Sequence, residues 1–329
     1  MRILVTGGAG YIGSHVVLAL LEAGHEPITL DNLSKGHEEA VLGGKFIQAD
    51  ITDGGAVQQI LDREGIEAVI HLAAESLVGE SVVHPEKYFR TNIYGSMTLL
   101  EAMRAGGVRY LVFSSTAAVY GEPERIPIPE DHPTAPTNPY GFTKLTVEQM
   151  MAWYERAHGL RYVSLRYFNA AGSEPEGRIG EDHKPETHLI PVVLQAALGL
   201  RPEVEIFGMD YPTPDGTCIR DYIHVMDLAE AHVLALKALM EGAPSGIYNL
   251  GNGQGYSNQE VIAAARRVTG RKIPARSGPR RPGDPAVLVA SSDRIQRELG
   301  WRPRYPELER IIETAWRWFE AHPQGFGRG

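Results

Sequence analysis

The sequence has 329 residues, of which 43% are hydrophobic and 22% charged, so a disordered or fibrous chain is excluded. Its 41 acidic and 32 basic residues give a formal net charge of −9, and such a surface repels a phosphate backbone. We therefore expect no nucleic-acid partner. The single cysteine, Cys218, excludes an intrachain disulfide, and we see no signal peptide or apolar stretch long enough to span a membrane. These features predict a cytoplasmic protein with no membrane association.

The first half of the chain alternates between short apolar runs and helical patterns. Continuous apolar runs are typical of strands that are covered on both faces of a sheet. We expect strands at 3–6, 27–30, 46–50, 68–72 and 110–114, and helices at 15–23, 56–63 and 88–105. This alternation predicts an α/β protein with a Rossmann-type, doubly wound parallel sheet.

The texture changes after about residue 170. Segments rich in Gly, Pro and charge predict long loops at 174–185, 211–216 and 276–285. Between them we expect helices at 227–239 and 259–269 and a strand at 247–250. We expect residues 1–172 to form the sheet domain, with 222–250 returning to it, and 173–329 to form a smaller, loop-rich domain.

A glycine-rich loop follows the first expected strand. Gly7, Gly10 and Gly13 have the spacing G-x-x-G-x-x-G, and such glycines let the backbone approach a pyrophosphate at a helix N-terminus. The alternative is a mere tight turn, but Asp31 at the end of the second strand can accept hydrogen bonds from a ribose diol and repel a 2′-phosphate. Asp50 ends the third strand at the same edge, near the adenine side. The loop in this context predicts NAD as the cofactor, in preference to NADP.

A tyrosine and a lysine form the pattern Y-x-x-x-K. Tyr140 and Lys144 share one face of an expected helix, and Thr116 lies just past the strand at 110–114. Lowering the pKa of a tyrosine from about 10 to about 7 takes roughly 4 kcal/mol, which we expect the lysine and a positive nicotinamide ring to supply. Thr116 then donates or relays a hydrogen bond to the same substrate oxygen. The alternative is a Tyr–Lys pair on the surface with no role in catalysis. The dinucleotide-binding loop in the same chain favours the catalytic interpretation of the pair.

Other titratable residues suggest less. The histidines lack spacings such as H-E-x-x-H and the lone cysteine offers no zinc site, so no metal is expected. His71 is interpreted as a packed core histidine. Arg220 and Arg281 are either ordinary surface residues or neutralise a bound diphosphate. An acidic protein needs local cations to bind a diphosphate, so we favour the second interpretation.

Several short segments together resemble one family. They are 6–15 (TGGAGYIGSH), 31–33 (DNL), 78–82 (VGESV), 114–116 (SST), 139–141 (PYG), 166–169 (RYFN) and 220–225 (RDYIHV). In these segments the chain resembles the extended short-chain dehydrogenase/reductase family, and in 182–191 and 210–225 its nucleotide-sugar 4-epimerases. The resemblance covers the chain from Arg2 to about Phe319.

The resemblance implies roles for individual residues. Tyr140 would be the base and acid, Lys144 its pKa partner and a nicotinamide-ribose contact, and Thr116 the hydroxyl relay. With Tyr140 and Lys144, the NAD site would comprise Gly7, Gly10, Tyr11, Ile12, Gly13, Asp31, Asn32, Asp50, Ile51, Leu72, Ala73, Ala74 and Phe168. With Thr116, the UDP-sugar would be held by Asn169, His188, Leu189, Phe207, Arg220, Arg281, Asp284 and Leu288.

The implied activity is that of an isomerase which interconverts UDP-glucose and UDP-galactose by transient oxidation at sugar C4. The implied fold places NAD on residues 1–172 and the UDP-sugar on the second domain. The resemblance also implies a homodimer joined by a four-helix bundle, for which 88–105 and 145–157 are candidate helices. Related epimerases of UDP-N-acetylhexosamines or UDP-pentoses stay open as alternatives.

Two more distant alternatives are less favoured. A 4,6-dehydratase of this family usually has Asp-Glu after the strand-end threonine, whereas Ala117-Ala118 follow Thr116 here. A non-catalytic NAD sensor typically lacks the tyrosine or the lysine, and this chain has both.

The chain departs from the family pattern at a few positions. Thr116 stands where many members have serine, and His188 where others have asparagine. Ser76 replaces a lysine and Thr91 an asparagine, which leaves only those cofactor contacts in doubt. Leu288 falls where a tyrosine or a small residue faces the sugar.

Overall fold

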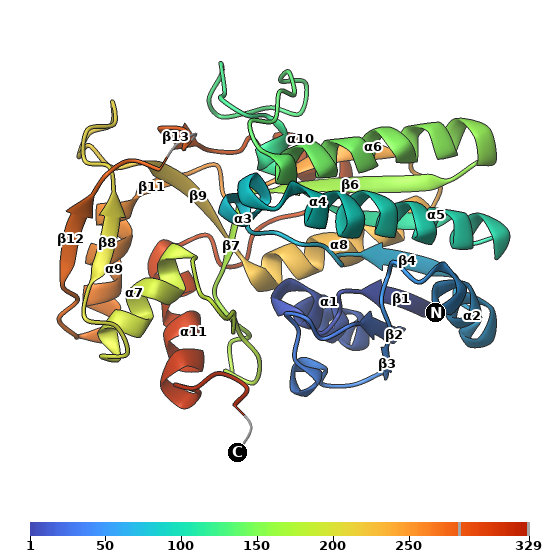
Figure 1. Ribbon diagram of the computed structural model, residues 1–329, viewed down its shortest axis with the longest axis horizontal. Helices are drawn as coiled ribbons and strands as arrows, with labels where there is room; N and C mark the ends of the chain where they lie inside the picture. Colours follow the sequence, from blue (N-terminus) through green and yellow to red (C-terminus); the bar gives the residue numbers. More distant parts are fainter. Residues whose placement is uncertain (282–283, 328–329) are drawn as a thin grey trace.

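The computed structural model describes residues 1–281 and 284–327 (Figure 1). A parallel seven-stranded sheet has the order β3-β2-β1-β4-β5-β6-β10, which is the doubly wound order with its switch point between β1 and β4. Its strands are β1 (Arg2–Thr6), β2 (Glu26–Asp31), β3 (Lys45–Gln48), β4 (Ala68–His71), β5 (Tyr110–Thr116), β6 (Arg161–Tyr167) and β10 (Gly246–Leu250). The predicted fold class is confirmed.

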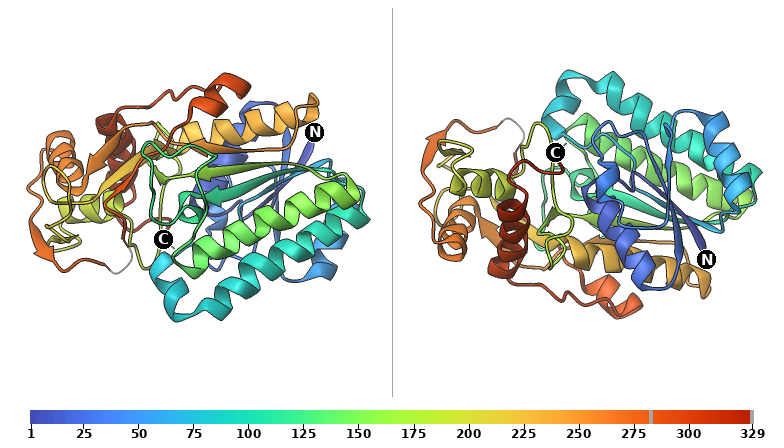
Figure 2. Two further views of the ribbon diagram at one scale, coloured as in Figure 1. Left: turned by 90° about the horizontal axis from the view of Figure 1, so that it is seen from above. Right: turned by 90° about the horizontal axis from the view of Figure 1, so that it is seen from below.

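Helices cover both faces of this sheet, and each face has its own apolar core (Figures 1 and 2). One face packs against α1 (Tyr11–Glu22), α8 (Val225–Met240) and α10 (Asp293–Leu299). The other packs against α2 (Gly54–Glu64), α5 (Gly95–Ala105) and α6 (Pro139–His158). Because neither face meets water, the central strands read as continuous apolar runs in the sequence.

Smaller sheets lie beyond the carboxyl edge of the large one (Figure 1, left). One contains β7 (Asn169–Ala171), β9 (Ile219–His224), β11 (Gly255–Ser257) and β13 (Val287–Leu288), and the other pairs β8 (Val204–Phe207) with β12 (Ala275–Gly278). A third apolar core lies among α7 (Leu189–Ala197), α9 (Asn258–Thr269) and α11 (Leu308–Ala321). The remaining helical turns are α3 (Val78–Val83), α4 (Pro85–Tyr88), the π-helical Phe89–Tyr94 and the 3-10 turns Glu38–Ala40 and Ala117–Val119.

Some predicted elements differ from the structure. The expected helix at 88–105 is α4, a π-helical segment and α5 in succession, and the side chain of Asn92 in the π segment is bound to both backbone groups of Glu75. Residues 276–278 were predicted as loop, but they belong to β12 because they pair with β8. That loop also contains residues 282 and 283, which lie outside the described residues.

The segment 222–250 divides between the sheets. Residues 222–224 belong to β9, which pairs with β7, so the prediction that this strand returns to the first sheet is wrong. In contrast, α8 packs against α1 and β10 pairs with β6 of the seven-stranded sheet. The division of the chain into two domains stays a prediction. Residues 328 and 329, the last two of the predicted second domain, lie outside the described residues.

Membrane insertion of a helix finds no support in the described part of the chain. None of its helices combines the length and hydropathy that a bilayer span needs.

Candidate active site

The glycine loop joins β1 to α1. A Cβ on Gly7, whose φ is +73°, would lie 2.6 Å from the Ala73 nitrogen, and one on Gly13 would lie 2.0 Å from the Gly7 oxygen. At Gly10, with its two chain neighbours set aside, the described residues bring only the Gly7 oxygen within 4 Å of such a Cβ, at 3.3 Å. Packing therefore requires Gly7 and Gly13, whereas Gly10 leaves an open surface at the start of the helix.

The N-terminus of α1 is built to receive an anion. Gly10 precedes the helix and provides no side-chain cap, so the first amides of α1 are left for a ligand or water. A helix N-terminus with an open glycine in front of it fits a pyrophosphate. The chain thus offers the cradle that the phosphates of a dinucleotide need.

Two carboxylates lie at the same edge of the sheet. Asp31 ends β2 and accepts hydrogen bonds from the amides of Ala9 (3.1 Å) and Leu33 (2.9 Å), while burial raises its pKa. The side-chain amide of Asn32 donates a hydrogen bond to the Asp50 carboxylate at 2.9 Å, so these two predicted residues are in contact. Asp50 lies two positions past β3, which ends at Gln48, and not within that strand.

The other predicted cofactor residues surround this edge. Leu72 and Ala73 follow β4, and the Leu72 amide donates to Thr6 of β1 at 3.0 Å. The Tyr11 hydroxyl donates to the Gly172 oxygen at 2.6 Å, which directs its side chain toward the segment after β7. Ile51 is buried, Ile12 packs against the core beside α1, and Phe168 packs against the apolar cluster around Ala117 and Tyr120.

Helix α6 carries the tyrosine and the lysine. Its first turn is fixed because the Asn138 side chain accepts a hydrogen bond from the Gly141 amide at 2.8 Å. Lys144 donates to the Ser114 carbonyl of β5 at 2.7 Å and lies 6.0 Å from the centre of the Tyr140 ring. Strand β5 ends at Thr116, two residues later than expected, so Thr116 is its last residue and does not lie past it. The three predicted catalytic residues are therefore brought to one strand end.

Burial dominates the electrostatics of this group. It raises the pKa of Tyr140, which Tyr167 raises further, and the Thr116 hydroxyl offsets the rise only in part. Burial lowers the pKa of Lys144 to about 7, against the opposing charge of Glu148. Desolvation therefore outweighs the hydrogen bond to Thr116, and the tyrosine pKa lies above its usual value. The decrease expected from the sequence depends on the lysine together with the positive nicotinamide ring, and it stays a prediction.

The partners behind this group were not predicted from the sequence. The Tyr167 and Ser114 hydroxyls are hydrogen-bonded to each other, and burial raises the pKa of Tyr167 to about 12. Glu148 lies one turn after Lys144 and forms a buried ion pair with Arg166 at 2.6 Å. The spacing of Tyr140, Lys144 and Glu148 was the available signal, since residues at i, i+4 and i+8 share a helix face.

Several predicted substrate residues gather on the small sheet of β9. Leu288 of β13 lies beside Arg220 in the strand register, and the Arg220 guanidinium donates to Asp284 at 3.0 Å. Asn169 of β7 donates to the Asp221 carbonyl at 3.1 Å. Leu288 also packs against the cluster that contains Ala117, which directly follows Thr116. This sheet therefore adjoins the catalytic strand end.

The remaining predicted substrate residues form two other contacts. The Arg281 guanidinium lies 4.0 Å from the centre of the Phe207 ring. His188 precedes α7, which begins at Leu189, and its ring contacts the carboxylate of Glu181 at 2.7 Å. His71 is a buried core residue, as expected: it is hydrogen-bonded to Thr6 and Ser96, and burial lowers its pKa to about 3.

These features define a class. The sheet is doubly wound, with a glycine loop after β1, an acid at the end of β2 and a Tyr–Lys pair beside β5. This framework is that of a dinucleotide-dependent enzyme of the short-chain dehydrogenase/reductase type.

Comparison with known proteins places the chain more closely. Residues 3–251 match the NAD dependent epimerase/dehydratase family. A UDP-glucose 4-epimerase of Halalkalibacterium halodurans is 59% identical over 326 residues, which cover 99% of this chain and 98% of the relative.

Solved structures agree. The UDP-glucose 4-epimerase of Brucella ovis in complex with NAD has a TM-score of 0.94 and 48% identity, and it covers 96% of this chain and 97% of its own. That of Bifidobacterium longum in complex with NAD+ and UDP has a TM-score of 0.94 and 38% identity over 99% and 100% of the two chains. The chain belongs to the NAD dependent epimerase/dehydratase family.

Proposed function

We propose that this protein interconverts UDP-glucose and UDP-galactose, with NAD as its cofactor. The observation that carries the proposal is the convergence of Tyr140, Lys144 and Thr116 at the end of β5, in a chain 59% identical to a UDP-glucose 4-epimerase. The end of β5, which bears Thr116, shares the edge of the sheet with the glycine loop. That edge is where doubly wound sheets bind their ligands.

The residues present fit NAD. The open surface at Gly10 and the uncapped start of α1 suit its pyrophosphate, and Asp31 suits a ribose diol. NAD, when bound, would supply the redox chemistry of the reaction, namely an acceptor for the hydride from sugar C4 and a donor for its return. The positive nicotinamide ring also provides the charge that the buried Tyr140 needs for a lower pKa.

Each catalytic side chain has one task in this proposal. Tyr140 takes the proton of the sugar 4-hydroxyl and gives it back after the sugar has turned over. Thr116 hydrogen-bonds the same oxygen, and Lys144, held by the Ser114 carbonyl, favours the phenolate through its charge. Because Lys144 has a pKa of about 7, its charge is sensitive to pH in the neutral range.

The UDP part is held apart from the chemistry. Arg220 and Arg281 neutralise the diphosphate, while Asn169, His188, Leu189, Phe207 and Asp284 position the nucleotide, and Leu288 faces the sugar. Firm binding of UDP with loose binding of the sugar allows the oxidised sugar to turn. In this division, the residues that would hold NAD lie in 1–172, and those that would hold the UDP-sugar lie in 173–329, apart from Thr116 and Asn169.

We further propose that the protein is a homodimer joined through α5 and α6. Large apolar side chains are exposed along these helices and the turn before them, namely Phe89, Met97, Phe142 and Trp153, which is 66% exposed. Such a row is typical of an interface. Light scattering of the purified chain should give twice the monomer mass, and Trp153→Glu should lower it; a monomeric parent contradicts the dimer.

Incubation of the purified protein with UDP-galactose tests the activity. We expect UDP-glucose to form without added NAD if the chain retains its cofactor, and the cofactor released on denaturation should be NAD. As a control, protein first loaded with NAD should also form UDP-glucose from UDP-galactose. If NAD-loaded protein forms no UDP-glucose, or forms a dehydrated sugar, the proposed activity is wrong.

A further inference from the structure

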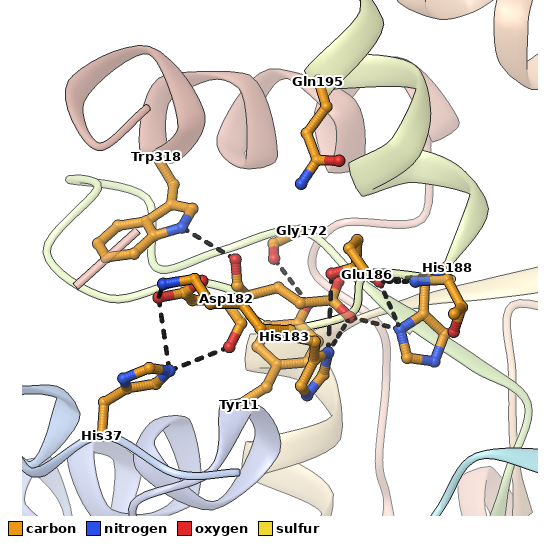
Figure 3. Close-up of polar contacts among 12 residues, drawn as sticks. Tyr11, His37, Gly172, Asp182, His183, Glu186, His188, Gln195 and Trp318 are labelled. Atoms are coloured by element: carbon orange, nitrogen blue, oxygen red, sulfur yellow. Dashed lines mark hydrogen bonds and ion pairs between the residues drawn. The ribbon is translucent and has the colours of Figure 1, made fainter. Parts of the chain in front are cut away.

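A compact group of ligand atoms lies in the segment between β7 and α7. Glu181, His183, Glu186 and His188 each direct one such atom inward, and all four atoms lie within 4.8 Å of one another. Figure 3 shows His183 between Tyr11 of the glycine loop and His188 at the start of α7, with Glu186 beside both histidines. Neither the proposed epimerisation nor its cofactor uses Glu181, His183 or Glu186.

The distances within this group match a tetrahedral ion. The Nδ1 atom of His183 is 3.0 Å from Glu181 and 3.7 Å from Glu186, and that of His188 is 2.7 and 3.2 Å from the same carboxylates. Around a zinc ion with bonds of about 2.1 Å, tetrahedral ligand atoms are separated by about 3.4 Å. The measured separations bracket this value, so an ion enters with small movements of the side chains.

One carboxylate oxygen in the group makes no hydrogen bond. Glu186 is only 6% exposed, and within residues 1–281 and 284–327 its Oε2 atom has no hydrogen-bond donor, although His183 lies 3.7 Å away. The other oxygen, Oε1, accepts from the amides of Thr187 (2.7 Å) and His188 (2.8 Å), which fixes the carboxylate. A buried carboxylate oxygen without a hydrogen bond is costly. A cation at the centre of the group lowers that cost.

The backbone around the group is held in place before any ion binds. The Trp318 indole donates to the Glu181 carbonyl at 3.2 Å, and His37 contacts the Asp182 carboxylate at 3.4 Å (Figure 3). A cavity of about 500 Å³, lined by Glu181, His183 and Glu186 among others, gives a path from solvent. Ligand set, separations, anchoring and access are the features expected of a metal site.

We propose that Glu181, His183, Glu186 and His188 bind one divalent transition-metal ion of the Zn²⁺ type. Two imidazoles and two carboxylates suit zinc, cobalt or nickel, whereas Mg²⁺ and Ca²⁺ prefer oxygen ligands alone. The ion holds the segment before α7 together, and through His183 it supports the packing of that segment on Tyr11, so its role is structural. The pattern E-x-H-x-x-E-x-H at 181–188 differs from spacings such as H-E-x-x-H and was therefore not predicted as a metal site.

Titration of the tag-free, chelator-treated protein with Zn²⁺, followed by calorimetry, tests the proposal. We expect one ion bound per chain, and Glu186→Gln and His183→Gln should each weaken binding at least about tenfold. His84→Gln is the matched control, because His84 and Glu86 form a similar but exposed pair. At one fixed Zn²⁺ concentration, the Tm of the parent should rise by about 3 °C and those of the two ligand variants by clearly less.

A second probe keeps the result independent of variant folding. Co²⁺ in a tetrahedral site with two imidazoles gives an intense visible absorption, so the parent should develop this band and Zn²⁺ should remove it. Absence of stoichiometric Zn²⁺ binding and of the Co²⁺ band overturns the proposal, and the group is then an ion-pair network with protonated histidines. Equal Zn²⁺ affinity in Glu186→Gln, His183→Gln and His84→Gln also overturns it.

Discussion

The carboxyl edge of the seven-stranded sheet and the small sheet around β9 hold their polar side chains in different ways. At the edge, Lys144 and Glu148 are 3% and 4% exposed, and their partners come from neighbouring strands. Around β9, the Asp284 side chain that pairs with Arg220 is 31% exposed, and Arg281 rests on the Phe207 ring. The first region fixes its groups by burial, and the second leaves them within reach of solvent.

This difference matches the division of labour in the proposed reaction. Proton transfer requires a tyrosine held in a dry environment, where the charge of a bound cofactor acts strongly on its pKa, and burial provides that environment. Recognition of UDP requires charges that can exchange water for phosphate, which partly exposed arginines do. The first region should therefore respond to substitution in turnover and stability, and the second in affinity.

Tyr140→Phe gives the largest expected effect. The ring packs as before, so NAD and UDP should bind as in the parent, but turnover should fall by about 10²–10⁴ because the acid–base group is lost. Steady-state assays with UDP-galactose measure this fall. Tyr248→Phe, which removes another buried hydroxyl far from the strand end, is the control and should keep its kcat. Near-parental turnover of Tyr140→Phe contradicts its role as the base.

Glu148→Gln tests how far burial governs the first region. The change leaves the buried Arg166 guanidinium without its ion-pair partner and should lower the free energy of unfolding by about 3–5 kcal/mol. Urea unfolding followed by circular dichroism measures it. Glu313→Gln breaks an exposed pair with Arg310 and should cost less than about 1 kcal/mol. A similar loss for both variants would mean that burial does not distinguish the pairs.

The elements of the first region were predictable because their signals are local. Continuous apolar runs predicted β1, β4 and β5, and the glycine spacing between a strand and a helix predicted the dinucleotide loop. The i, i+4 spacing of Tyr140 and Lys144 placed both on one face of α6. Each of these signals depends on residues that are neighbours in the sequence, where helix and turn geometry are decided.

What the sequence could not predict depends on distant partners. Strand β9 pairs with β7, some 50 residues earlier in the chain. Residues 276–278 of β12 were predicted as loop because their partner β8 lies some 70 residues earlier. That burial raises the Tyr140 pKa in the chain by itself was also not predictable, because desolvation depends on what covers a side chain. The roles of the predicted site residues themselves stay predictions.

Arg281→Ala tests the second region. Loss of a charge-assisted hydrogen bond to phosphate should raise KM and weaken UDP binding by about tenfold to a hundredfold, with kcat nearly unchanged. The preceding residue offers a matched control: Arg280 stacks on Tyr211 at 4.2 Å and pairs with Asp210, so Arg280→Ala should keep its UDP affinity. Calorimetric titration with UDP measures both variants. A fall in kcat alone for Arg281→Ala would contradict anchoring.

Leu288 provides the smallest expected effect, at the point where the two regions meet. It belongs to β13 beside Arg220, yet it packs against the cluster that contains Ala117, next to Thr116. An N-acetyl group is several heavy atoms larger than a hydroxyl, and overpacking against this leucine costs about 1–3 kcal/mol. The parent should therefore turn over UDP-N-acetylgalactosamine about tenfold to a hundredfold less efficiently than UDP-galactose.

Leu288→Ser removes this bulk and should narrow the difference, chiefly by improving kcat/KM for the acetylated sugar. Leu42→Ser, an exposed leucine elsewhere, is the control and should leave the ratio unchanged. Competition assays with both sugars measure the ratio directly. Comparable kcat/KM values for the two sugars in the parent would show that Leu288 is not a gate, and that the wall on this side of the pocket gives way to the larger substituent.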